Sequence, residues 1–87
     1  MNTEDKIVDQ FDMNRIRRNT KLPIFCVYEH PTDYPDKYVA RLWNVDVPMS
    51  LITTADTLEE IREKRPVGMV TLHRYETDDP AIVETWI

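Results

Sequence analysis

The sequence predicts an α+β domain, with a small antiparallel sheet of four to five strands and one helix packed on a face. From residue 22 onward, short apolar runs alternate with a period of two, and turn-forming residues separate them. One segment, ADTLEEIREKRP, breaks this pattern with a helix-capping signal and a terminating proline. Because the helix stands apart from the strand pairs, an α+β fold is favoured over a parallel one.

The first strand pair is expected as a hairpin over residues 23–45. PIFCVYE and YVARLWNV are rich in β-branched and aromatic residues, and the segment HPTDYPDK between them is typical of a turn or loop. Alternation along the second run would place Arg41 and Trp43 on one sheet face and Tyr38 on the other. A further strand is expected over residues 48–54, beginning at a proline whose missing amide donor is tolerated there.

The strongest local signal predicts a helix over residues 56–65. Asp56 would cap the first turn with Glu59 as its reciprocal partner, and Pro66 would end the helix. RPVG then fits a type I turn with the proline at its second position. MVTLHRY and AIVETWI predict a second hairpin over residues 69–87, with ETDDP as its turn.

Residues 1–21 differ from the rest of the chain. TEDKIVDQFDMNRIRRN has acidic residues near its start and arginines near its end, a charge order that favours a helix. We therefore expect an N-terminal helix over residues 4–18, with a flexible arm as the open alternative. The chain would then consist of this helix or arm, followed by a single α+β domain over residues 22–87.

Two stretches echo each other, YEHPTDYP at residues 28–35 and YETDDP at residues 75–80. Both lie between expected strands, and threonine, aspartate and proline are residues that turns require. The spacing from each proline to the next tryptophan also differs. We interpret the echo as repeated turn chemistry and not as a repeated reaction site.

Composition excludes several classes of protein. With 41% hydrophobic and 31% charged residues the chain is globular, and it lacks both a signal-peptide pattern and the apolar run of about 20 residues that a membrane helix needs. Cys26, the one cysteine, lies in an apolar run and is expected as a small buried hydrophobe. A chain without disulfides fits a reducing compartment, so we expect a cytoplasmic protein that binds no membrane.

The residues suited to catalysis or metal binding are few. His30, Asp33 and Asp36 share one loop, but the sequence contains no CxxC or HxxxH ligand pair. A single glycine excludes a P-loop and a dinucleotide fingerprint, and no nucleophile elbow is present. We therefore expect no cofactor, no metal and no enzymatic activity.

What remains is an interaction or regulatory role, with a protein partner or a second copy of the chain. Tyrosines in a proline-braced loop and an arginine and tryptophan on one sheet face are suited to an interface. The candidate contact residues are Tyr34, Tyr38, Arg41 and Trp43. The net charge of −5 makes the body a poor nucleic-acid binder, but a basic segment over residues 15–21 leaves nucleic-acid association as the alternative. Its candidate residues are Arg15, Arg17, Arg18 and Lys21.

Overall fold

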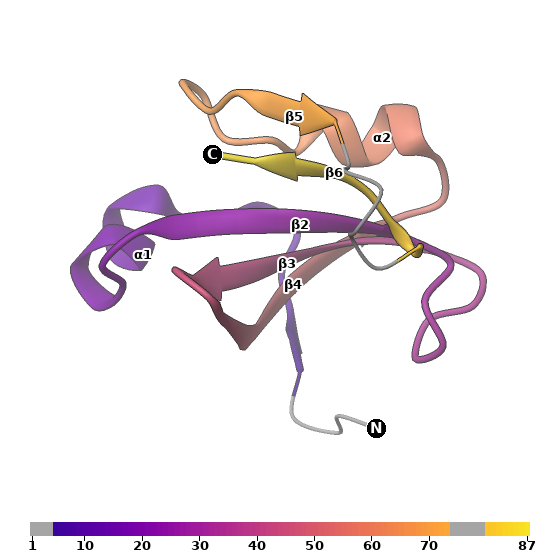
Figure 1. Cartoon of the computed structure of the whole chain (residues 1–87), viewed down its shortest axis with the longest axis horizontal. Helices are drawn as coiled ribbons and strands as arrows, with labels where there is room; N and C mark the ends of the chain where they lie inside the picture. Colours follow the sequence, from indigo (N-terminus) through magenta and orange to yellow (C-terminus); the bar gives the residue numbers. More distant parts are fainter. Residues whose placement is uncertain (1–4, 74–79) are drawn as a thin grey trace.

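The computed structural model describes residues 5–73 and 80–87, and within them six strands form one sheet accompanied by two helices (Figure 1). In chain order the elements are β1 (Lys6–Ile7), α1 (Met13–Asn19), β2 (Pro23–Glu29), β3 (Tyr38–Asn44), β4 (Val47–Ala55), α2 (Leu58–Glu63), β5 (Thr71–His73) and β6 (Ile82–Trp86). The strand order is β1-β4-β3-β2-β6-β5. Neighbouring strands are antiparallel, except that β1 runs parallel to β4. The α+β class is therefore confirmed, with more strands than the sequence predicted.

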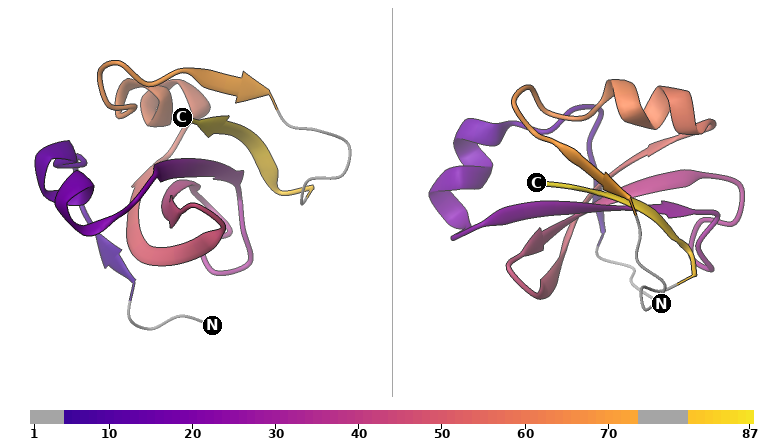
Figure 2. Two further views of the ribbon diagram at one scale, coloured as in Figure 1. Left: turned by 60° about the vertical axis from the view of Figure 1, so that its left-hand side comes forward. Right: turned by 45° about the horizontal axis from the view of Figure 1, so that its top comes forward.

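The sheet is strongly curved. Figure 2 shows β2, β3 and β4 bending into an open roll, with α1 beside it and α2 close to β5. The register shifts once between β2 and β6, after Val27, and once between β3 and β4, after Arg41. Irregularities of this kind increase local twist and bend a strand, which fits the rolled shape.

The main core lies on one face of this roll. Phe25 and Val27 of β2 pack there with Trp86 of β6, and all three are fully buried. Helix α1 contributes Ile16 to the same cluster, and helix α2 contributes Ile61. Because β6 pairs with β2 in the interior of the sheet order, the last strand is integral to the fold.

Helix α2 is shorter than predicted and its cap is displaced by one residue. Thr57, and not Asp56, caps the helix: its hydroxyl accepts the amide of Glu60 at 3.1 Å and donates to that residue's carboxylate at 3.2 Å. The side chain of Asp56 forms an ion pair with Lys37 instead. The predicted cap at Asp56 with Glu59 is therefore wrong, and Thr57 and Glu60 take these positions one residue further along the chain.

The turn after α2 also differs from the prediction. The amide of Met69 donates to the carbonyl of Pro66 at 3.2 Å, so the proline takes the first position of the turn and Gly68 the third. Gly68 has a φ of +90°, which the third position of a type II turn requires and which glycine adopts without strain. The expected type I turn is therefore wrong.

The N-terminal helix predicted over residues 4–18 is not confirmed. Residues Lys6–Ile7 form β1 on the outer edge of β4, and the helix covers only Met13–Asn19. Asp12 lies in an extended conformation and caps α1 by accepting the amide of Arg15 at 3.3 Å. An aspartate cap at this point starts a helix late, and the residues before it pair with β4.

Residues 5–11, which we call the strap, wrap around the edge of β4 from one face of the sheet to the other. Asp5 contacts Arg41 on the face opposite the core, and Phe11 stacks on Phe25 of the core with ring centroids 4.2 Å apart. Between them, the amide of Val8 donates to the carbonyl of Ile52 at 2.9 Å. The division of the chain at residue 21 stays a prediction, but β1 lies in the same sheet as the later strands.

Candidate functional site

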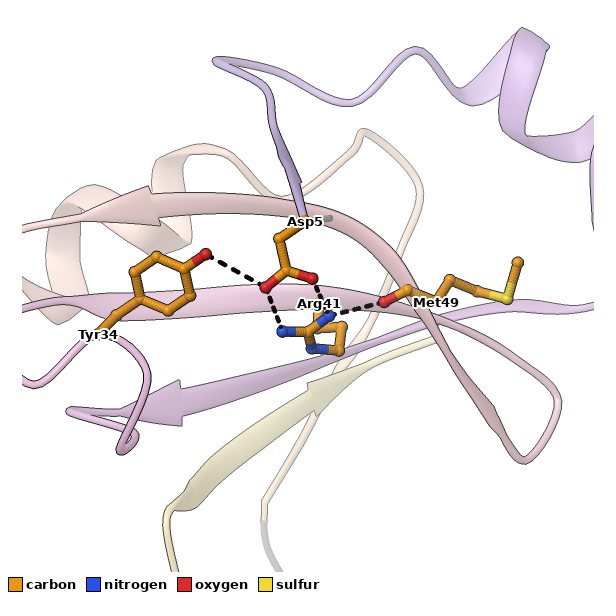
Figure 3. Close-up of polar contacts among 4 residues, drawn as sticks. All are labelled: Asp5, Tyr34, Arg41 and Met49. Carbon is orange, nitrogen blue, oxygen red and sulfur yellow. Dashed lines mark hydrogen bonds and ion pairs between the residues drawn. The ribbon is translucent and has the colours of Figure 1, made fainter. Parts of the chain in front are cut away.

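Two of the four predicted contact residues, Tyr34 and Arg41, meet at the carboxylate of Asp5 (Figure 3). The guanidinium of Arg41 donates from Nη1 to Asp5 Oδ1 at 2.8 Å and from Nη2 to Oδ2 at 2.9 Å. The same Nη1 donates to the carbonyl of Met49 at 2.8 Å, and the Tyr34 hydroxyl donates to Asp5 Oδ2 at 3.2 Å. The Asp5 side chain is 1% exposed and that of Arg41 is 15% exposed.

The electrostatics of this cluster favour its ionised, hydrogen-bonded state. The hydrogen bonds from Arg41 lower the pKa of the Asp5 carboxyl below its usual value, against the opposing effect of burial. Burial, and then the hydrogen bond to Asp5, raise the pKa of the Tyr34 phenol. Through these hydrogen bonds to both Asp5 oxygens, the cluster fastens the strap to the sheet.

The other two predicted contact residues lie elsewhere. Tyr38 packs against the core, places its ring edge-on to His30 at 5.3 Å and donates its hydroxyl to Glu29 at 3.0 Å. Trp43 follows Arg41 on the same face of β3 and pairs across the sheet with β2 and β4. The structure therefore distributes Tyr38 and Arg41 to opposite faces, as their alternation predicted.

The loop between β2 and β3 is closed by its own backbone hydrogen bonds. The amide of Tyr34 donates to the carbonyl of Pro31 at 2.9 Å, and the amide of Lys37 donates to the carbonyl of Tyr34 at 3.1 Å. The first of the two echoed stretches is therefore a turn, as predicted. The second falls mostly on residues 74–79, which lie outside the described residues.

The basic segment is exposed on and after α1. Arg17 and Arg18 lie in the last turn of the helix, and Arg15 lies one turn earlier. The backbone amide of Lys21 donates to the side chain of Asn44 at 3.0 Å. Among residues 5–73 and 80–87, none of these four basic side chains forms an ion pair.

Sequence reasoning missed a groove between the N-terminal segment and strands β3 and β4. Its volume is about 260 Å³. Apolar side chains form its floor, and Lys6 and Arg15 stand at its rim. The lining residues are Lys6, Val8, Gln10, Asp12, Arg15, Ile16, Asn19, Thr20, Leu42, Met49 and Leu51. Met49 and Leu51 are two residues apart in a predicted strand, so the sequence could place both on one face of the sheet. The opposite wall of the groove is formed by residues that the sequence assigned to a helix over residues 4–18, so the groove itself was not predicted.

Other features of the described chain concern binding less directly. Within residues 5–73 and 80–87, no group of three or more histidine, cysteine, aspartate or glutamate side chains is arranged to hold a metal ion. Neither described helix has the length and apolar character to cross a membrane. Cys26, expected as a small buried hydrophobe, is half-buried in β2. Comparisons with protein-family models, curated proteins and solved structures give no match.

Proposed function

We propose that this protein is a small, non-catalytic, cytoplasmic binding module that recognises a partner protein through the groove beside α1. The observation that carries the proposal is the apolar floor, which is open to a partner but supported from below by the core. Ile16 and Leu42 are almost fully buried and belong to the main core cluster, while Met49 and Leu51 pack against it. Because the floor residues pack against the core, part of their side-chain freedom is already lost on folding, which reduces the entropy cost when a partner binds.

The size of the groove suits one inserted side chain of a partner protein. Pockets for small ligands and cofactors occupy roughly 300–1,000 Å³, and this groove, at about 260 Å³, lies near the small end of that range. A space of this size fits an apolar anchor side chain of the kind that dominates many protein interfaces. In this proposal the partner protein inserts one apolar side chain into the groove.

A second candidate function is association with nucleic acid through the basic segment. The observation that favours it is the exposure of Arg15, Arg17 and Arg18 without ion-pair partners among the described residues. Such side chains are free to contact phosphates. The net charge of −5 opposes general nucleic-acid binding, which ranks this candidate second.

A pull-down from host lysate with matched variants tests the groove. Met49→Glu places a charge on the floor, whereas Ser50→Glu makes the same change on the neighbouring residue, which is exposed and does not line the groove. We expect the wild type and Ser50→Glu to capture one protein that survives nuclease treatment, and Met49→Glu to lose it. Capture that Met49→Glu leaves unchanged contradicts the proposal.

The same experiment separates the other predictions. Capture that disappears with nuclease, or in an Arg17→Ala/Arg18→Ala variant, assigns the function to the basic segment. Capture that is lost in Tyr34→Ala but retained in Met49→Glu assigns the binding function to the 30–38 loop. Self-association is measured independently, as the molar mass of the purified protein by light scattering, since a homodimer doubles the mass of the 10.4 kDa chain.

A further inference from the structure

We propose that the occupant of the groove is an acidic peptide segment of the partner protein, with one apolar side chain flanked by carboxylates. This inference rests on the proposed function and adds the chemistry of the ligand. Two properties of the groove lead to it, the net positive charge of its lining and the poor hydrogen-bonding capacity of the adjacent strand edge.

The lining of the groove carries two cations, Lys6 and Arg15, against one acid, Asp12, so its net charge is positive. Residues 6–21 contain five basic side chains, Lys6, Arg15, Arg17, Arg18 and Lys21, against two acidic ones, Asp9 and Asp12. The Asp9 carboxylate lies 3.4 Å from Lys64 Nζ, and Asp12 caps α1. Lys6 and Arg15 line the groove and form no ion pair within the described part of the chain.

Charge complementarity therefore favours carboxylates at this rim. The rest of the chain carries the excess of acidic residues that makes the net charge −5. An acidic segment is attracted to the face of the groove and repelled by the remaining surface, which orients the encounter. A basic peptide would experience the reverse.

Strand addition is a poor mode of binding at this edge, so recognition falls to side chains. Strand β1 pairs only with Leu51 and Ile52 of β4. Among the described residues, no strand lies beside the outer edge of residues 47–50. Pro48 has no amide to donate, and the Met49 carbonyl already accepts from Arg41. Backbone pairing of the kind that extends a sheet is therefore blunted here.

A titration of the ¹⁵N-labelled protein with three synthetic peptides tests the ligand chemistry. The probes are Glu-Asp-Leu-Glu-Asp, the same peptide with alanine at its centre, and Lys-Arg-Leu-Lys-Arg, all blocked at both ends. We expect the acidic leucine peptide to shift the amides of Lys6, Arg15 and Leu51 in a saturable way, about tenfold more tightly than either other probe. Equal shifts from the basic peptide, or no saturable shift from the acidic one, overturn the inference.

Two charge-removing variants on one helix provide a matched control. Arg15 lines the groove and Arg17 does not, although both lie on α1. Loss of one exposed ion pair weakens binding about fivefold. We expect Arg15→Gln to weaken the acidic peptide by this factor and Arg17→Gln to weaken it less than twofold. Equal weakening by both would show general charge attraction and overturn the groove assignment.

Failure of this inference is distinguishable from failure of the proposed function. If the lysate partner depends on Met49 while the acidic peptide does not bind at the groove, the binding module stands and the ligand chemistry is wrong. If capture of the partner is indifferent to Met49→Glu, the proposed function itself is wrong.

Discussion

Two buried carboxylates, Asp5 and Glu84, each bind an arginine, but Asp5 lies at the edge of the sheet and Glu84 lies in its interior. Asp5 spreads its two oxygens over both terminal nitrogens of Arg41, whose side chain is 15% exposed. Glu84 receives Arg62 on one oxygen only, from Nε at 3.0 Å and Nη2 at 2.8 Å, and this arginine is 51% exposed. Its other oxygen accepts the indole of Trp86 at 2.8 Å.

We therefore expect the position of each ion pair in the sheet to determine how much of the fold opens when the pair is broken. Glu84 lies in β6, between β2 and β5, and bridges that strand to α2. Asp5 precedes the two-residue strand β1 at the edge of the sheet. We expect damage at Glu84 to unfold the whole domain and damage at Asp5 to release the strap alone.

The largest effect is expected from Arg62→Ala, which leaves the Glu84 carboxylate buried with the Trp86 indole as its one side-chain partner among the described residues. Removing one member of a buried pair costs about 3–5 kcal/mol, and the exposure of Arg62 places this case near the lower end. The measurement is the urea midpoint with an unchanged slope. The double variant Arg62→Ala/Glu84→Gln should recover part of the loss, and a single-variant loss below about 1 kcal/mol would contradict the prediction.

A smaller and more local effect is expected from Asp5→Asn. Hydrogen bonds to charged groups contribute about 1.5–3 kcal/mol, and Arg41 keeps its bond to the Met49 carbonyl, so we expect a loss near about 1.5 kcal/mol. Hydrogen exchange should accelerate at the Val8 amide and stay unchanged at Phe25 in the core. Tyr34→Phe is the control, since it removes only the third hydrogen bond; equal acceleration at both amides would show that the strap does not open separately.

The smallest expected effect is the dependence of strap opening on acidic pH. Because the pKa of Asp5 is lowered from its usual value of 3.8, its contribution to stability is complete above that value and is lost as the pH falls through the lowered pKa. Exchange at the Val8 amide should therefore show no change in opening free energy between pH 7 and pH 5, and a loss below about pH 4. Asp5→Asn should lack this acid step, and an identical step in that variant would assign it to another carboxylate.

Local patterns predicted the parts of the fold that depend on neighbours in sequence. PIFCVYE and YVARLWN form paired strands because their alternation and the intervening turn agree. The helix cap was misplaced because Asp56 and Thr57 are both capping residues followed three positions later by a glutamate; Thr57 caps the helix, and Asp56 pairs with Lys37, 19 residues away. Local rules carry no information about such a partner.

The strap and the groove were missed for the same reason. The local charge order over residues 4–18 favours a helix, whereas the partners that hold part of this segment extended come from β3 and β4. Tyr34 and Arg41 were recognised as candidates, but Asp5, which joins them, is 36 residues from Arg41 in sequence. The groove depends on the position of this segment and so could not be inferred without it.

The pairing of β1 with β4 also sets an order of events during synthesis. Lys6 lies beside Leu51, so the strap leaves the ribosome well before its docking strand has been made. At about 5–20 residues per second, this interval lasts on the order of seconds, far longer than the microseconds in which a hairpin forms. The β2–β3 hairpin is thus available to fold first, and the strap closes over β4 as a late, long-range step. A nascent chain halted before residue 51 would therefore have neither the closed strap nor the groove.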